Sequence, residues 1–230
     1  MTARDVDIVP VGDAAAMAIL GDSIDLATVR SAWRIADLVR ERMGARALDV
    51  VPAYASVLVR FDPAKVELAH VMACLRGAHS AQASADASRA RTLRIGVRFG
   101  GEFGADLDEA SAAVGLKPDR YVAKFCGAEY RVAFVGFIAG FPYLMGLPDE
   151  LAVPRRSAPR DRVPAGSVAI AGTQCGIYPR VSPGGWRLLG ATRATIFDHA
   201  RRPPALFAPG NRVRFESVER VDDARAEVEP

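Results

Sequence analysis

Residues 136–156, GFIAGFPYLMGLPDELAVPRR, place three glycines and three prolines among large apolar side chains, and the stretch ends in two arginines. Neither one helix nor one strand accounts for the whole stretch, because glycine and proline interrupt both. The composition is typical of short strands joined by tight turns that lie close to other backbone. This part of the chain therefore predicts a β domain rather than a layer of long helices.

The sequence around this stretch repeats the same pattern. From residue 129 onward, short apolar segments alternate with turn residues, and nine of the twenty glycines lie between Gly136 and Gly190. The expected strands are EYRVAFVGF (129–137), SVAIAG (167–172), GIYPRV (176–181), GWRLLG (185–190), ATIFD (194–198) and NRVRFESV (211–218). This spacing favours an antiparallel barrel or sandwich over a parallel sheet.

The N-terminal third has a different pattern. VDIVPVG (6–12) and AAAMAIL (14–20) predict two strands, and apolar residues at three- or four-residue steps predict a helix between Asp25 and Gly44. ALDVVPAY (47–54) and ASVLVRF (55–61) predict two more strands, followed by a second helix from Asp62-Pro63 through Leu75. The order β-β-α-β-β-α is that of a small α+β layer.

A change in composition separates these two parts. Residues 78–91, AHSAQASADASRAR, contain no large apolar side chain and contribute little to a core, so they read as a linker. We expect a small α/β domain over 1–80, a linker over 81–91, a β domain over 92–220 and a C-terminal tail over 221–230. Within the β domain, LRIGVRF (93–99) predicts a strand, and two short helices are expected over 106–116 and 118–125.

Bulk properties exclude several classes of protein. The chain has 230 residues and a formal net charge of +3, which is too small to indicate nucleic-acid binding. No apolar run approaches the ~20 residues of a membrane span, and no secretory leader is recognisable. Cys74, Cys126 and Cys175 are widely spaced and odd in number, which favours reduced thiols. These features predict a cytoplasmic protein with no membrane contact.

Few motifs for chemistry stand out. The three histidines have no ligand spacing, and no nucleotide loop is present, so the chain shows neither a metal ligand set nor a covalent cofactor site. Asp106, Asp108 and Glu109 are interpreted as helix-start charges. The arginines of PRRSAPRDRVPAG (154–166) allow two interpretations: solvated residues in barrel turns, or part of a ligand loop.

Four linked motifs carry a resemblance. GFIAGFPYL, PRRSAPRDRVPAGSVAIAG, GTQCGIYP and SPGGWRLLGAT, together with VVPAYASVLVRFDP, resemble the allophanate hydrolase subunit 1 family in order and separation. That family includes the B components of bacterial 5-oxoprolinases and an inhibitor of a sporulation histidine kinase. The resemblance spans nearly the whole chain and implies a small α/β domain followed by a cyclophilin-like β barrel.

The resemblance also implies a function shared with other subunits. Family members usually act beside a homologous second subunit, in a unit that resembles a carboxyltransferase domain, and a third, hydrolase subunit completes ATP-dependent opening of 5-oxoproline to glutamate. The chain is then expected to supply half of a site, with ATP entering through the assembled complex. The alternatives are a carboxyltransferase or allophanate-type subunit of urea or amide metabolism, and a non-catalytic regulator of a histidine kinase.

The motif residues supply a hypothesis for ligand binding, although no catalytic residue can be assigned. We expect residues 136–146 to form one wall of a groove for a small anionic or amide substrate, with anion contacts from arginine and hydrogen bonds from Gln and Tyr. The candidate residues are Gly140, Phe141, Tyr143, Arg155, Arg160, Gln174 and Tyr178. One departure from the family pattern is Phe125, which stands in KFCGAEY where relatives often have histidine.

Overall fold

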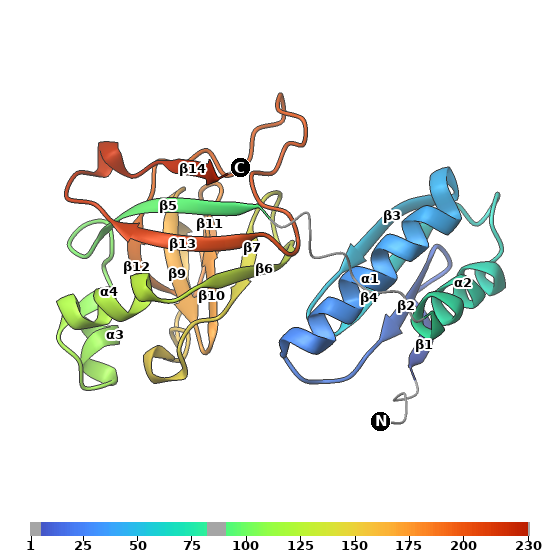
Figure 1. The fold of residues 1–230 in the computed structure, drawn as a ribbon, viewed down its shortest axis with the longest axis horizontal. Coiled ribbons are helices and arrows are strands. Elements are labelled where there is room, and N and C mark those ends of the chain that lie inside the picture. The colour runs from blue at the N-terminus through green and yellow to red at the C-terminus, as the bar shows by residue number, and fades with distance from the viewer. Residues whose placement is uncertain (1–5, 82–90, 230) are drawn as a thin grey trace. The chain divides into compact units, whose positions relative to one another are not determined.

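The computed structural model describes residues 6–81 and 91–229, which belong to two compact units, residues 1–88 and 89–230 (Figure 1). The predicted linker falls almost entirely outside the described residues. Its boundaries therefore stay a prediction.

The N-terminal unit contains the six predicted elements in the predicted order. They are β1 (Asp7–Pro10), β2 (Ala15–Ile19), α1 (Leu26–Met43), β3 (Ala47–Pro52), β4 (Ser56–Phe61) and α2 (Leu68–Ser80), with a short helix η1 (Gly44–Arg46) after α1. The strands form an antiparallel sheet in the order β1-β2-β4-β3. Alternate strand residues such as Ala16, Val57 and Val59 share one buried core with Ile35 of α1 and Leu75 of α2. Both helices therefore cover one face of the sheet (Figure 1).

The ends of α1 agree with the prediction from sequence, whereas the ends of α2 do not. The carboxylate of Asp25 accepts a hydrogen bond from the Thr28 backbone N–H at 2.9 Å, and α1 ends before Gly44, as predicted. The prediction for α2 was wrong at both ends, because Asp62-Pro63 begins a turn and the helix itself runs from Leu68 to Ser80. The Asp62 carboxylate accepts a hydrogen bond from Ala64 N–H and so stabilises that turn.

The second unit is a mixed β-barrel with two short helices. Its elements are β5 (Thr92–Phe99), α3 (Leu107–Ala113), α4 (Pro118–Gly127), β6 (Tyr130–Val135), β7 (Pro142–Met145), η3 (Asp149–Leu151), β8 (Arg160–Val163), β9 (Ser167–Ala171), β10 (Gln174–Ile177), β11 (Ser182–Gly184), β12 (Arg187–Ala191), β13 (Arg212–Ser217), η4 (Val221–Asp223) and β14 (Ala226–Glu229). The predicted class, an α+β unit followed by a mainly β barrel, is confirmed.

The barrel closes through seven strands. The sheet runs β12-β9-β10-β7-β6-β13-β5, and pairing of β12 with the end of β5 closes the ring. The strand pair β5 and β13 is parallel, so the barrel is mixed rather than wholly antiparallel. β14 adds to the other half of β5, and therefore residues 226–229 extend the sheet instead of forming a free tail. β8 and β11 pair separately, outside the barrel sheet.

One expected strand is absent, and four strands of the structure were not predicted. ATIFD (194–198) is not a strand: apart from an isolated bridge at Phe197, it lies in a loop whose carbonyls bind the Arg201 guanidinium. The strands β7, β8, β11 and β14 were not predicted. β7 and β11 contain proline, β8 is highly charged, and β14 alternates Glu with small or branched residues.

The barrel interior is filled by apolar side chains, and α4 lies against β13 (Figure 1). Phe125 of α4 is fully buried there, with ring centroids 5.7 Å from Phe99, 5.2 Å from Tyr130 and 5.0 Å from Phe215. The phenylalanine at this departure from the family pattern is therefore a core residue, and its large buried ring stabilises the attachment of α4 to the barrel.

Candidate functional site

A second apolar layer covers the outside of the barrel sheet. In β10, Cys175 and Ile177 point into the barrel core, so the alternating residues face outward, beneath the segments that follow β6 and β10. We name this layer the outer aromatic cluster; it consists of Phe141, Val163, Ala169, Tyr178 and Leu188, with Ile138, Tyr143 and Trp186 packed against them.

Phe141 lies at the centre of the outer aromatic cluster. Its ring centroid is 5.0 Å from that of Tyr143, 5.1 Å from Tyr178 and 5.5 Å from Trp186, all with steep edge-to-face angles. Only 1% of its surface is exposed. The structure thus brings three predicted residues together, but Phe141 anchors the covering segment and does not present a face to a ligand.

Tyr178 is also committed to internal contacts. Burial raises the pKa of its hydroxyl to about 12, and a hydrogen bond from the Trp186 backbone only partly opposes this. Gly184 packs so tightly against the hydroxyl that a Cβ there would lie 2.3 Å from the oxygen. At neutral pH the hydroxyl is protonated and closely packed, so Tyr178 stabilises the cover of the barrel.

A buried carboxylate fixes the arginine-rich segment. Asp106, which is 2% exposed, accepts hydrogen bonds from Arg160 at 2.8 Å twice, from Arg156 at 3.0 Å and from the Leu188 N–H at 2.8 Å. We name these four residues the Asp106 cluster. Burial opposes ionisation of Asp106, but these contacts outweigh it and lower the pKa of the carboxyl below its usual value.

This cluster adds a tertiary contact to two residues singled out in the sequence; Asp106 does lie at the start of α3, with Asp108 and Glu109 in the first turn, as predicted. Asp106 precedes α3, yet its carboxylate makes no capping bond to that helix and instead binds residues about fifty positions further along the chain. Arg160, a predicted ligand residue, uses its planar fork on Asp106, and this contact raises its pKa. Arg160 and Arg156 therefore hold the segment between η3 and β8 against the barrel.

The remaining predicted residues lie at different places. Arg155 is exposed and Gln174 is partly buried at the start of β10. Gly140 has a φ of 85°, and a Cβ at this position would lie 2.6 Å from the Cβ of Phe197. Gly140 therefore allows the loop after β6 to contact the loop that holds Phe197.

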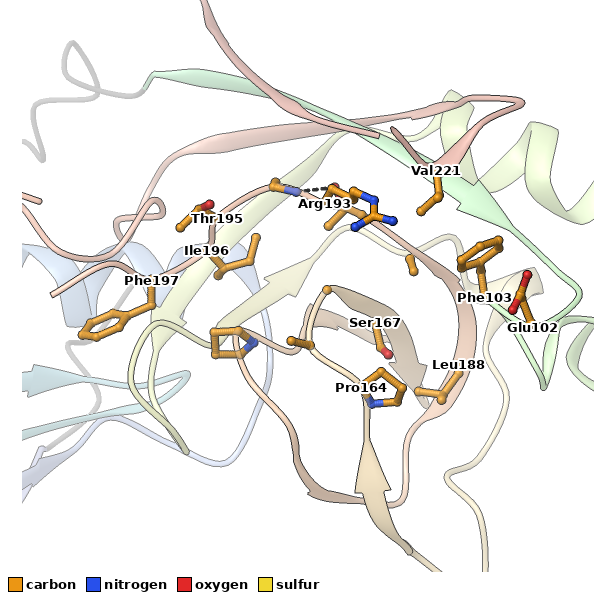
Figure 2. A pocket seen from close by; sticks show the side chains of 16 residues that line it. Glu102, Phe103, Pro164, Ser167, Leu188, Arg193, Thr195, Ile196, Phe197 and Val221 are labelled. Atoms are coloured by element: carbon orange, nitrogen blue, oxygen red, sulfur yellow. Dashed lines mark hydrogen bonds between the residues drawn. The ribbon is translucent and has the colours of Figure 1, made fainter. Parts of the chain in front are cut away.

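A cavity of about 590 Å³ lies between the turn that joins β8 to β9 and the segment that follows β12 (Figure 2). The turn after β5 and η4 complete its wall. Phe103, Leu188, Ile196 and Phe197 supply much of the apolar lining, and Ser167 contributes a buried hydroxyl-bearing side chain. Leu188 belongs to this wall, to the outer aromatic cluster and to the Asp106 cluster, so the cavity adjoins both.

Hydrogen bonds hold the wall made by residues 191–197. The Thr192 hydroxyl donates to Ala224 O at 2.9 Å, and the Arg193 N–H donates to the same carbonyl at 2.6 Å. The Arg201 guanidinium donates to the carbonyls of Thr195 at 3.1 Å and Pro204 at 3.2 Å. These bonds fix the backbone of the segment, and its side chains define the shape of the cavity.

One residue of the cavity wall belongs to an ion pair. Arg193 lines the cavity (Figure 2). Its Nε lies 3.0 Å from a carboxylate oxygen of Asp222, and 61% and 63% of the two side chains are exposed. No sequence motif marked Arg193, because this residue directly precedes the segment 194–198, which was wrongly expected to be a strand. Its partner is in a short helix that no motif marked.

The described residues carry binding groups more clearly than reactive groups. Burial raises the pKa of the Cys126 thiol to about 11 and that of fully buried Cys175 further, so neither is a nucleophile at neutral pH. Across residues 6–81 and 91–229, no three His, Cys, Asp or Glu side chains gather as a metal site. No helix in the same ranges is long and apolar enough to cross a membrane.

Comparisons with known proteins agree with the fold and cover most of the chain. Residues 6–207 match the family described as carboxyltransferase domain, subdomain C and D. The chain is 37% identical over 206 residues to the B component of 5-oxoprolinase from Escherichia coli O157:H7, a match that covers 89% of the chain and 93% of that protein. It is 36% identical over 217 residues to the B component of 5-oxoprolinase from Haemophilus influenzae, covering 91% and 97%.

Among solved structures, the protein TTHA0988 superimposes on 90% of the chain with a TM-score of 0.78 and 35% sequence identity. The match covers only 40% of TTHA0988. In that protein, a region similar to this chain is therefore joined to a larger remainder.

Proposed function

Because the chain belongs to the carboxyltransferase domain, subdomain C and D, family, and is a homologue of the B component of 5-oxoprolinase, we propose that it is one subunit of a multi-component, ATP-dependent 5-oxoprolinase. The reaction is hydrolysis of a cyclic amide, which gives glutamate from 5-oxoproline. The observation that carries the proposal is the match along 93% of the Escherichia coli protein, since it includes both units of the fold rather than one shared domain.

The proposal assigns substrate binding, and not bond cleavage, to this chain. The buried thiols are poor nucleophiles, and the sequence has no phosphate-binding loop, so we assign ATP and the reacting groups to partner subunits. The chain supplies a shaped cavity and charged side chains that can orient a small polar molecule.

We further propose a homologous second subunit and a third, hydrolase-like subunit as the partners. TTHA0988 supports this proposal, because more than half of that protein lies outside the region similar to this chain, as expected if this region works together with a further part. Use of ATP by the complex fits a cytoplasmic location. Of the residues expected to contact ligand, Phe141, Arg160 and Tyr178 make internal contacts that hold the cover of the barrel, and their contact with a ligand stays a prediction.

Coexpression with proteins encoded beside this chain tests the proposal. We expect a stable complex in size-exclusion chromatography and ADP release that depends on 5-oxoproline, whereas the chain alone gives negligible turnover. Full activity of the isolated chain would contradict the shared site. An assembled complex that hydrolyses ATP only with another amide, or with none, would contradict the substrate.

A further inference from the structure

The cavity beside β9 combines apolar walls with a small set of polar groups. Phe103, Ile196 and Phe197 provide apolar surface, and Ser167 and Thr195 provide hydroxyl groups (Figure 2). Its volume of about 590 Å³ is within the range of small-molecule sites. The lining therefore presents both polar and apolar surface, and polar groups that converge on one hollow fix the orientation of a ligand and select its functional groups.

Arg193 is the cation of this lining that can exchange its partner. Its side chain and that of Asp222 are each more than half exposed, and an ion pair of this kind contributes little net stability. An incoming carboxylate can replace Asp222 and still satisfy the guanidinium, at small cost to the fold. By contrast, Arg156 and Arg160 are bound to a buried carboxylate in the Asp106 cluster.

We propose that this cavity is the subsite for the carboxylate-bearing cyclic amide, with Arg193 as the residue that binds the carboxylate. The inference rests on the proposed function and adds to it a place and a binding residue. Arg193 offers a planar set of donors that matches a carboxylate in two-point contact.

The other lining groups match the rest of such a molecule. A lactam has one N–H donor and one carbonyl acceptor. Glu102 offers an acceptor for the N–H, and the hydroxyls of Ser167 and Thr195 offer donors for the carbonyl. The negative charge of Glu102 also repels the ligand carboxylate and so directs it toward Arg193.

The position of the cavity also suits a shared site. The same segment that carries Arg193 carries Phe197, which contacts Gly140 at the end of the loop after β6. The cavity is larger than a small lactam needs, so reacting groups from a partner subunit have room to enter. The subsite thus links the GFIAGFPYL motif to substrate binding through Phe197, without direct contact between Phe141 and the ligand.

Calorimetric titration of 5-oxoproline into the full-length chain tests this inference. We expect the wild type to bind, Arg193→Gln to bind about tenfold more weakly through loss of a charge-assisted contact, and Arg193→Lys to recover only part of the affinity. Thr195→Phe should reduce binding by narrowing the cavity from an exposed position. The matched control is Arg120→Gln, an exposed arginine on α4 outside the cavity, which should bind as the wild type does.

Melting temperatures of all variants confirm that each is folded. No binding by the wild type, or equal affinity of Arg193→Gln and wild type, overturns the inference. Turnover by the assembled complex separates this result from the proposed function. If the complex hydrolyses 5-oxoproline while Arg193→Gln leaves affinity and KM unchanged, the function stands and the subsite lies elsewhere.

Discussion

Among the described residues of the barrel unit, arginines contact Asp106 and Asp222, and the two aspartates differ in their surroundings. In the Asp106 cluster, a carboxylate that is 2% exposed receives two arginines and a backbone N–H. In the cavity wall, Arg193 meets Asp222 at a similar distance, but both side chains are mostly in solvent. Similar pairs of residue types therefore serve different purposes: the first fixes the fold, and the second leaves an arginine available to a ligand.

The difference follows from the cost of removing water from charge. A buried carboxylate without its partners loses hydration that nothing replaces, so its contacts are retained. Exposed pairs contribute about 0–1 kcal/mol, because water competes for both groups. The structural arginines and the candidate binding arginine therefore differ in the burial of the carboxylate that they contact, and not in residue type or in distance.

The largest expected effect is on the Asp106 cluster. Asp106→Asn should lower the free energy of unfolding by about 3 kcal/mol, because two arginines lose a charged acceptor inside the cover of the barrel. The effect should be at the lower end of the range for buried pairs, since Arg156 and Arg160 keep 31% and 24% of their side chains exposed. Urea denaturation measures this change.

Asp222→Asn is the matched control in the exposed pair, and it should change stability by less than about 1 kcal/mol. If both substitutions lower the free energy of unfolding equally, burial of the carboxylate does not distinguish the two contacts.

The next effect concerns the loop contact beside the cavity. Gly140→Ala should cost about 2 kcal/mol, because the residue has a φ of 85° and its new Cβ would lie 2.6 Å from Phe197 Cβ. Gly172→Ala is the control: it also has positive φ, at 57°, but its Cβ would meet no atom within 4 Å, so about 1 kcal/mol is expected. Equal losses in thermal unfolding would mean that the Phe197 contact adds nothing.

Acid should reduce the contribution of the Asp106 cluster. The folded-state pKa of Asp106 is lowered, so its stabilisation is fully present above the unfolded-state pKa of about 3.9 and is lost as pH falls through the folded value. The stability difference between wild type and Asp106→Asn should therefore be full at pH 7 and shrink below about pH 4. Urea midpoints at several pH values give the sign, and a difference that grows on acidification would contradict the assignment.

The smallest expected effect on stability comes from cutting between the two units. Because the composition of residues 82–90 offers little apolar surface to bury, brief trypsin treatment should cleave after Arg89 or Arg91 and leave two stable fragments. Mass spectrometry identifies the cut. Preferential cleavage within residues 160–200 would argue against this boundary and against a well-held cover of the barrel.

The sequence predicted the parts of the fold that depend on local pattern. The apolar periodicity of α1 and its cap at Asp25 are contained in a few neighbouring residues, and the glycine spacing indicated the barrel. Barrel closure through β12 and β5, and the parallel pairing of β5 with β13, could not be predicted, because these pairs join residues about 90 to 120 positions apart.

The candidate site was predicted only in part for the same reason. The motif residues Phe141, Tyr143 and Tyr178 do gather, but the sequence could not show that they form a second core layer. Asp106 binds Arg160 across 54 positions, and Arg193 binds Asp222 across a loop and a strand. The arginine-rich motif thus indicated that charged groups are recognised. Whether an arginine is structural or free to bind a ligand depends on how deeply its partner is buried, and a sequence pattern does not show burial.

The most direct test compares Arg193→Gln with Arg155→Gln in the assembled complex, with KM for 5-oxoproline as the measurement. Arg155 is the anion-binding residue that the motifs predicted, and Arg193 is the one that the cavity indicates. We expect Arg193→Gln to raise KM about tenfold, through loss of a charged contact, and Arg155→Gln to change KM by less than about twofold. A rise in KM for Arg155→Gln with an unchanged value for Arg193→Gln would contradict the account and place the substrate on the outer face of the barrel.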